Sequence, residues 1–378
     1  MLKTYKFKLL ATNRQDKLHQ IVNISSDIYN HCVALHKRYY KLFGKSLNMY
    51  KLQKHITKLK KLGKYRHWNL VPSQAIQNIT ERINESYKKF FDYVKKRKGL
   101  KCSPPKFKKR SRYKSFTLKQ AGYKIQDNTI WLNGYAFKFY KSREIDGAIK
   151  TITVKRDSLG HFYICVSLET KANSTKPMTG KNAGFDFGLK IFLTSDENSN
   201  MQIEMPRYYL ENITKLKRLS RNLSKRKRDS NNRKRAKEQL ARLHLKIERQ
   251  RKDFHFKLAN NLLSEFDTLC FETLNIKAMQ MLWGKKVSDY GYAQFFNILQ
   301  SKAQEYGKTI SQIDKFYPSS KACSCCGYVL EKLELKTREW QCPECKTNHL
   351  RDVNAANNIL RVGTSTLAGE TIRPTKVG

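Results

Sequence analysis

The sequence has few acidic residues and no long apolar run. Its 378 residues include 31 aspartates and glutamates against 76 lysines and arginines, a formal net charge of +45. No apolar segment approaches the roughly 20 residues that a membrane-spanning helix requires, so we expect no transmembrane segment. The first residues alternate apolar and basic side chains without the apolar core of a secretion signal, which favours an intracellular protein. Such a charge favours nucleic acid as the partner, because each neutralised phosphate releases counterions.

Cysteine is scarce outside one short segment. Four of the nine cysteines are scattered, and five lie between Cys323 and Cys345. A secreted disulfide framework would spread them, whereas two CxxC pairs fifteen residues apart are typical of a four-thiolate zinc site. We therefore predict one structural Zn²⁺ bound by Cys323, Cys326, Cys342 and Cys345. Cys325 is the surplus thiol and could replace one ligand, and four unligated buried cysteines remain the alternative.

The first 175 residues predict a β-domain that is interrupted by helices. Residues 3–9 alternate like a strand, residues 13–91 have helical periodicity, and residues 114–169 again read as strands. The clearest pair is a hairpin of 151–156 and 161–167 around a turn at 157–160. We expect one β-domain from 1–12 and 106–175, with 13–105 as a helical insertion.

The remainder of the chain predicts an α/β domain. One strand carries Asp186, a second ends at Glu272, and a third spans 309–314. Between the first two, residues 211–262 predict a basic helical hairpin, and helices are expected at 293–306 and 353–360, with no order beyond 362. The domain would comprise 181–318 and 349–378, and a zinc ribbon at 319–348 would interrupt it, with two strands between Tyr328 and Trp340.

Three acids at the ends of these elements could act together. Taken singly, Asp186 could be a buried ion-pair partner, Glu272 an exposed strand-end residue and Asp352 a favourable acid in the first turn of a helix. As a set in a cation-rich chain, they predict a carboxylate cage for two divalent metals, of the kind that hydrolyses phosphodiesters. Oxygen ligands suit Mg²⁺ or Mn²⁺ rather than zinc.

Two basic segments predict contacts with phosphates. Residues 95–114 contain eleven lysines and arginines and no acid, and residues 225–237 contain eight with one aspartate. The alternative is a solvated helix face or a localisation-like patch. The expected phosphate contacts are Lys106, Lys108, Lys109, Arg110, Lys225, Arg226, Lys227 and Arg228.

Several motifs, in this order, resemble the transposon-encoded TnpB family, which is related to type V CRISPR effectors. They are GFDFGLK (184–190), CFETLNIKAM (270–279), SSKACSCCGY (319–328), WQCPECKTNHLRD (340–352) and VNAANNI (353–359), together with YKFKLL (5–10), VPSQAIQNI (71–79) and PPKFKKR (104–110). The sequence departs from the family at Leu350, where a second acid is usual, and residues 279–288 do not align.

The resemblance implies a fold, an activity and partners. The fold would be an RNase H-like (RuvC) nuclease domain with an inserted zinc ribbon, plus an N-terminal, β-barrel-like wedge domain split by a helical recognition insertion. Asp186, Glu272 and Asp352 would be the catalytic acids of a cytoplasmic, nucleoid-associated endonuclease, monomeric with its RNA. A guide RNA would read double-stranded target DNA by base pairing, and the protein would read a short flanking motif.

The residues that would read the flanking motif are predicted from their position in the chain. Candidates by position are Tyr50, Gln74, Gln77 and Asn78, because glutamine and asparagine can pair bidentately with adenine; ordinary exposed helix polarity is the alternative. Three other functions stay open: an RNA-independent transposase, a non-cleaving RNA-guided repressor, and a stand-alone compact CRISPR effector. A transposase would act without RNA, a repressor would not cleave DNA when metal is present, and a CRISPR effector would be encoded beside CRISPR repeats.

Overall fold

The computed structural model describes residues 2–96, 102–170, 175–334 and 336–370. Internal contacts divide the chain into two units, Met1–Lys171 and Ala172–Gly378. Parts of several sequence predictions lie outside the described residues: position 1 of the β-domain, 97–101 of the basic linker, 171–174 of the expected domain boundary, 335 of the expected zinc ribbon and 371–378 of the expected nuclease domain. Among the described residues, no helix is long and apolar enough to cross a membrane.

The first unit contains a four-stranded antiparallel sheet that brings the two ends of this region together. Its order is β1-β7-β6-β2, so β1 (Leu2–Lys8) pairs with β7 (Phe162–Glu169), although about 150 residues separate them in sequence. The predicted hairpin is confirmed as β6 (Ala148–Arg156) and β7, which are antiparallel partners. A bridge from Leu9 to Phe139 links this sheet to a second, three-stranded one. The remaining strands of the unit are β2 (Ser115–Leu118), β3 (Tyr123–Gln126), β4 (Thr129–Leu132) and β5 (Tyr135–Lys138).

The helices of the first unit lie between β1 and β2 in the sequence and share one core with the strands. They are α1 (Gln15–Phe43), α2 (Met49–Leu59), the 3-10 helix η1 (Gly63–Leu70) and α3 (Ser73–Lys96). Each α-helix buries one apolar stripe, and Leu18, Ile28, Leu52 and Ile79 are almost fully buried. Helix α1 ends where Gly44 adopts a left-handed conformation (φ +63°), which glycine allows at low cost.

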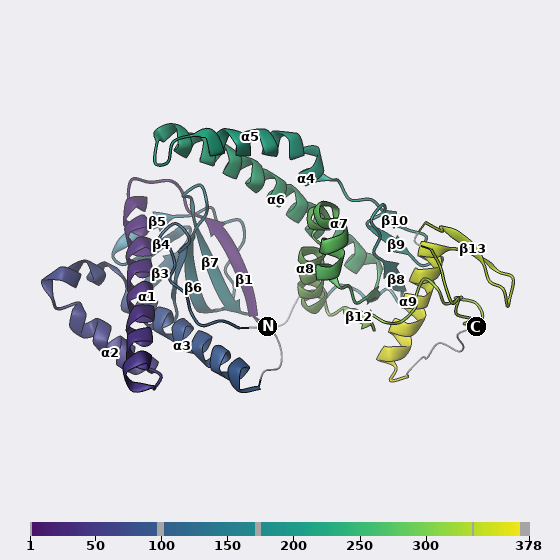
Figure 1. The fold of residues 1–378 in the computed structure, drawn as a ribbon, viewed down its shortest axis with the longest axis horizontal. Helices are drawn as coiled ribbons and strands as arrows, with labels where there is room; N and C mark the ends of the chain where they lie inside the picture. Colours follow the sequence, from purple (N-terminus) through teal and green to yellow (C-terminus); the bar gives the residue numbers. More distant parts are fainter. Residues whose placement is uncertain (1, 97–101, 171–174, 335, 371–378) are drawn as a thin grey trace. The chain divides into compact units, whose positions relative to one another are not determined.

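The second unit is built on a mixed five-stranded sheet of order β10-β9-β8-β11-β12 (Figure 1). Strands β8 (Asn182–Asp186), β11 (Thr268–Glu272) and β12 (Thr309–Ile313) are mutually parallel, and β9 (Leu193–Ser195) runs antiparallel to β8. At the edge, β10 (Gln202–Ile203) pairs with β9. From β8 the chain first adds strands on one side of the sheet, and it returns to add β11 and β12 on the other.

Helices cover both faces of this sheet. One face carries Phe185 and Phe271, whose rings stack 5.5 Å apart within a core shared with α6 (Asn231–Glu265) and α8 (Tyr292–Tyr306). The other face packs against α9 (Arg351–Leu367), where Cys270 and Ile313 contact Ile359 and Val362. Helix α9 continues well beyond the predicted end at residue 360, because its apolar spacing continues through Val362 and it packs along the sheet.

The predicted helical hairpin is present as α5 (Ile213–Lys225) and α6, and the turn at 226–230 lies between them. A small core of Leu216, Leu243 and Ile247 joins the two helices. A short helix α4 (Tyr208–Glu211) precedes them. Helix α7 (Ile276–Tyr290), which the sequence did not predict, contains a kink at Gly284.

The cysteine-rich segment folds differently from the prediction in one respect. Its strand pair is β13 (Glu339–Gln341) with β14 (Asn348–Leu350), which flank the second CxxC pair. Among the described residues of 328–340, the expected pair of strands is not found, and a single bridge joins Ala322 to Val329 across the first CxxC pair. The turn at the second CxxC pair brings its two flanks close enough to pair, which leaves the longer segment as an irregular loop.

Candidate active site and cysteine cluster

Two acids lie at adjacent strand ends in the middle of the sheet. Asp186 is the last residue of β8 and Glu272 the last residue of β11. The register pairs Phe185 with Phe271, so the next residue on each parallel strand lies at the same height. Neighbouring strands are about 4.8 Å apart. The chain changes direction across the sheet between β8 and β11, and this is where open α/β sheets bind their ligands, beyond the carboxyl ends of the strands.

Both acids project from the face that α9 covers. Side chains alternate along a strand, and Phe185 and Phe271 point into the core on the opposite face. Gly184, two residues before Asp186, approaches α9 so closely that a Cβ there would lie 2.3 Å from the Ala356 carbonyl oxygen. Because Gly184 and Asp186 share a face, the carboxylate of Asp186 points toward α9.

Helix α9 contributes the third acid. Asp352 is in its first turn and half-buried, and its carboxylate lies 3.5 Å from the Arg338 guanidinium. Glu272 lines a small cavity of about 200 Å³ with Phe187 and Tyr292. Glu272 and Asp352 both lie close enough to Asp186 to act on its charge, so the structure brings the three acids that the sequence singled out to one end of the sheet.

The electrostatics of Asp186 show that the three acids interact. Burial raises the pKa of Asp186 well above its ordinary value, the neighbouring charges of Glu272 and Asp352 raise it further, and Arg351 lowers it. Burial also raises the pKa of Glu272. Desolvation and like charges both disfavour the ionised form, so a divalent cation at this position would relieve both. The donor set, three carboxylates, fits Mg²⁺ or Mn²⁺.

A fourth acid supports this site and was not found from the sequence. Asp196 is 1% exposed, and its carboxylate accepts hydrogen bonds from the Gly184 N–H (3.0 Å), the Ser199 N–H (3.1 Å) and the Ser199 hydroxyl (2.9 Å). It thereby fixes β8 two residues before Asp186. The only local signal was its place in a polar turn, SDENSN, where an aspartate is ordinary.

The four predicted cysteines converge on one point. Among the described residues, their ligand atoms form a group within 4.8 Å of one another, and the Cys323–Cys345 and Cys326–Cys342 sulfurs are each 3.6 Å apart. Four sulfurs bound tetrahedrally at about 2.3 Å from one zinc would be about 3.8 Å apart. A hydrogen bond between Cys345 and Thr347 lowers the pKa of that thiol to about 6, whereas burial raises the pKa of Cys323 to about 12. The geometry fits one Zn²⁺, and Cys325 is exposed and outside the group.

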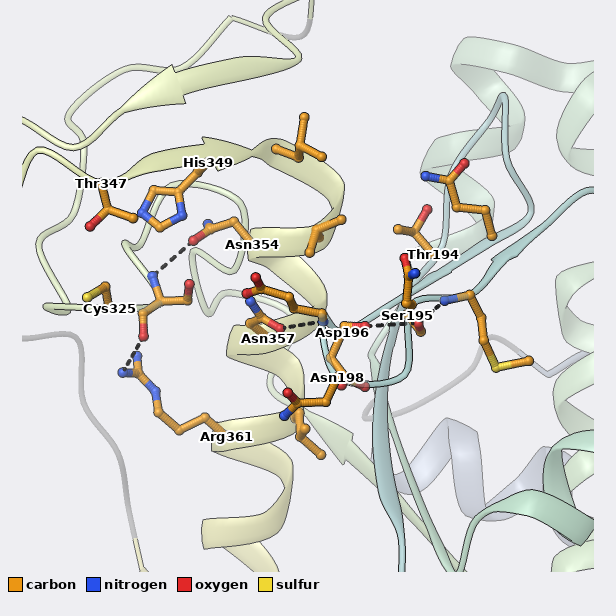
Figure 2. Close-up of a pocket in the computed structure, with 18 of the residues that line it drawn as sticks. Thr194, Ser195, Asp196, Asn198, Cys325, Thr347, His349, Asn354, Asn357 and Arg361 are labelled. Atoms are coloured by element: carbon orange, nitrogen blue, oxygen red, sulfur yellow. Dashed lines mark hydrogen bonds between the residues drawn. The ribbon is translucent and has the colours of Figure 1, made fainter.

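A cavity of about 860 Å³ lies between the β9–β10 turn, the cysteine-rich segment and α9 (Figure 2). Its lining is mainly neutral and polar and includes Asn198, Asn357 and Cys325, with Arg361 as its cation. Val353, the residue after Asp352, and Leu350, two residues before it, also line the cavity. The cavity therefore lies beside the acids, and none of the three lines it.

The residues predicted to contact phosphates differ in whether their side chains are exposed or are held by other residues of the chain. Lys225, Arg226, Lys227 and Arg228 are exposed at the turn between α5 and α6, as are Lys106 and Lys109 in their segment. In contrast, Arg110 forms a bidentate pair with Asp27 (2.9 and 2.6 Å), and the Lys108 ammonium lies 4.6 Å from the centre of the Tyr29 ring. Asn30 also bonds the backbone of Lys108, so this segment is docked on α1.

The candidates for reading a flanking motif lie on two helices of the first unit. Tyr50 is 68% exposed on the first turn of α2, and Gln74, Gln77 and Asn78 are on the first two turns of α3. Gln77 is exposed, and Gln74 and Asn78 are half-buried. Their role stays a prediction.

Comparisons with known proteins agree with the resemblance. The family described as "Probable transposase" (OrfB_IS605) matches residues 163–282, and the "Cas12f1-like, TNB domain" matches residues 292–359. The chain is 29% identical to a "Putative RNA-guided DNA endonuclease" of Streptomyces pristinaespiralis, with 84% of this chain and 79% of that protein covered. It is 25% identical to the "Putative RNA-guided DNA endonuclease InsQ" of Escherichia coli (strain K12), with 98% and 95% covered. These matches confirm the resemblance of this chain to the TnpB family.

A solved structure shares the fold. The chain described in "Cryo-EM structure of the Cas12f1-sgRNA-target DNA complex" matches with a TM-score of 0.56 at 13% identity, over 95% of this chain and 98% of that one. At this identity the likeness concerns the fold alone.

Proposed function

We propose that this chain is an RNA-guided DNA endonuclease that cuts phosphodiester bonds at the acids Asp186, Glu272 and Asp352. The observation that carries the proposal is the meeting of the three carboxylates at the switch point of the sheet, where Asp186 is held with a strongly raised pKa. The names of the relatives support the guide RNA and the DNA target.

The three acids would act as ligands of two Mg²⁺ or Mn²⁺ ions. Bound there, the metals would supply an activated water and neutralise the charge that develops on the leaving oxygen. The residues of this chain hold the carboxylates in place: the sheet register aligns Asp186 with Glu272, Asp196 fixes β8, and α9 presents Asp352.

The finer fold assignments belong to the same proposal. The mixed sheet with β8, β11 and β12 parallel and β9 antiparallel supports an RNase H-like (RuvC) domain of 181–318 and 349–378. Residues 319–348 would be a zinc ribbon whose Zn²⁺ is structural. The two-sheet part formed by 1–12 and 106–175 would be the wedge domain, and helices α1–α3 of 13–105 the recognition insertion.

The proposal is tested by purifying the protein from cells that carry its native downstream DNA and sequencing the RNA bound to it. The complex is then incubated, in the presence of Mg²⁺, with plasmids that carry a matching target beside randomised flanking bases. We expect cleavage that depends on the RNA and on a short flanking motif. Asp186→Ala, Glu272→Ala and Asp352→Ala should each abolish cleavage and retain RNA and target binding, because each removes metal ligands and no phosphate contact.

The matched control is Asp253→Asn, which removes an acid of the same unit that pairs with Lys257 on the surface of α6. It should cut at the wild-type rate. Strong cutting by the Asp352→Ala protein would remove that residue from the mechanism.

A second candidate, an RNA-independent transposase, is favoured by the description of the matching family as a probable transposase. The same carboxylates would then cut and rejoin DNA ends. Cutting of element ends by protein freed of RNA, without any requirement for a guide, would favour this candidate over the first.

A further inference from the structure

Helix α9 continues directly from the cysteine-rich segment. Strand β14 ends at Leu350 and α9 begins at Arg351, with no loop between them. Asp352 is the second residue of the helix. The position of this acid therefore depends on how the first turns of α9 are held against the segment that precedes it.

Two buried asparagines attach α9 to the first CxxC pair. Asn354 and Asn358 are 1% and 0% exposed and lie one helical turn apart. The side-chain amide of Asn358 donates to the carbonyls of Ser319 (2.9 Å) and Ala322 (2.7 Å), and that of Asn354 also donates to Ala322 (2.8 Å). In return, the Ser324 N–H donates to Asn354 Oδ1 (2.9 Å), a bond that Figure 2 shows. The side-chain amides of both asparagines thus form hydrogen bonds with the loop that carries Cys323.

Further contacts join the same two parts. His349, the residue before Leu350, lies with Nε2 3.0 Å from the Cys323 sulfur. Arg361 donates to the Ser324 carbonyl (3.4 Å) and to Asn358 Oδ1 (3.0 Å). The cysteine cluster is therefore tied to the helix on both sides of the point where the chain enters it.

The opposite side of α9 leaves no room for compensating movement. A Cβ on Gly184 would lie 2.3 Å from the backbone of α9, and a Cβ on Gly363 would lie 2.5 Å from the Cys270 sulfur. A helix packed this closely on the sheet cannot absorb a shift, because protein interiors are near their maximum density. Its rotation is set jointly by the sheet and by the two asparagines.

We propose that Asn354 and Asn358 are positioning residues that transmit the fold of the cysteine cluster to the nuclease metal site by fixing Asp352. The proposal rests on the proposed function, because it takes Asp352 as a metal ligand. Metal ligands are commonly oriented by hydrogen-bonded neighbours, whose loss weakens metal binding by about 10–100-fold. Here the neighbours act through the helix, and the cluster becomes a condition for activity as well as for folding.

The test measures Mn²⁺ binding by electron paramagnetic resonance on the full-length, zinc-loaded protein without nucleic acid. Asn358→Asp keeps the shape of the side chain but turns a carboxylate oxygen toward two carbonyls. We expect Mn²⁺ to bind about 10–100-fold more weakly, with one zinc per chain retained and cleavage recovered at raised Mn²⁺. Asn354→Asp keeps the acceptor for Ser324 and loses the donor, and should show the same change.

The matched control is Asn357→Asp, which places the same charge on the neighbouring position of α9. Asn357 accepts a hydrogen bond from the Glu197 N–H and does not bond the cysteine loop, so its Mn²⁺ affinity should change little. Wild-type affinity in both the Asn354 and the Asn358 variants, or loss that raised Mn²⁺ does not rescue, would overturn the inference.

A failure of the proposed function has a different signature. If Asp352→Ala binds Mn²⁺ as tightly as the wild type, the acid is not a ligand and the proposed metal site is wrong. If Asp352→Ala loses Mn²⁺ and the asparagine variants do not, the metal site stands and only the positioning role fails.

Discussion

Replacing Asp186 by asparagine should stabilise the protein in the absence of Mg²⁺ while it abolishes cleavage. Burial and the charges of Glu272 and Asp352 raise the pKa of this carboxyl well above its ordinary value. The folded protein therefore holds the proton more tightly than the unfolded chain does. The stability that the protonated Asp186 carboxyl contributes is present below the unfolded pKa of about 3.9 and is lost as the pH rises through the folded pKa. At a pH above the unfolded pKa, this carboxyl in the metal-free site therefore lowers the stability of the folded protein, whether it keeps its proton or ionises, and a neutral amide of the same shape avoids that cost.

The size of the effect follows from the pKa difference. Each unit by which the folded pKa exceeds the unfolded one corresponds to about 1.4 kcal/mol at a pH above both. In a domain of 150–250 residues, 1 kcal/mol shifts the melting temperature by about 2–4 °C. The gap in melting temperature between the variant and the wild type should therefore widen by a few degrees for each pH unit between the unfolded and the folded pKa, and it should close toward pH 4. Mg²⁺ at 100 times its dissociation constant would restore about 2.7 kcal/mol to the wild type.

The assay is thermal unfolding followed by circular dichroism between pH 4 and pH 8, with zinc bound and with or without Mg²⁺. Asp196→Asn is the control, because this buried carboxylate accepts three hydrogen bonds and loses acceptors when it becomes an amide. It should be destabilised by about 1–3 kcal/mol at neutral pH. If Asp186→Asn were also less stable than the wild type without Mg²⁺ at pH 7–8, the electrostatic account of this site would be refuted.

Three further outcomes are expected. Metal analysis of the wild type should find one zinc per chain. Cys326→Ser should lose this zinc, whereas Cys325→Ser, outside the cluster, should keep it. A wild-type protein that folds with no zinc would refute the site. Gly184→Ala should lower the free energy of unfolding by about 1–3 kcal/mol, measured with denaturant, and impair cleavage, because its Cβ meets the backbone of α9. Gly63→Ala, with nothing within 4 Å of the added Cβ, should be tolerated. Equal stability of the two variants would contradict the close approach. Neutralising residues 225–228 should weaken nucleic-acid binding for all sequences and flatten the dependence of log affinity on log salt by about 0.9 per lost contact on duplex DNA; an unchanged slope with altered sequence preference would contradict this.

The local patterns of the sequence were sufficient for much of the architecture. Alternation and helical spacing predicted β1, the β6–β7 hairpin, α5 with α6, and the strands that carry Asp186 and Glu272. The CxxC spacing predicted which four sulfurs converge, because two short turns place their own cysteines with little help from the rest of the fold. These features depend on residues that are close in sequence.

The tertiary structure alone decided how the distant parts meet. The register that aligns Asp186 with Glu272 joins strands more than 80 residues apart, and one residue of slip would turn one acid to the opposite face. The length of α9, the pairing of β13 with β14, and the roles of Asp196 and the two buried asparagines likewise depend on packing partners. A buried polar side chain takes its role from the carbonyls and N–H groups that it bonds. These partners come from distant parts of the chain, so the residues next to it in sequence do not predict them.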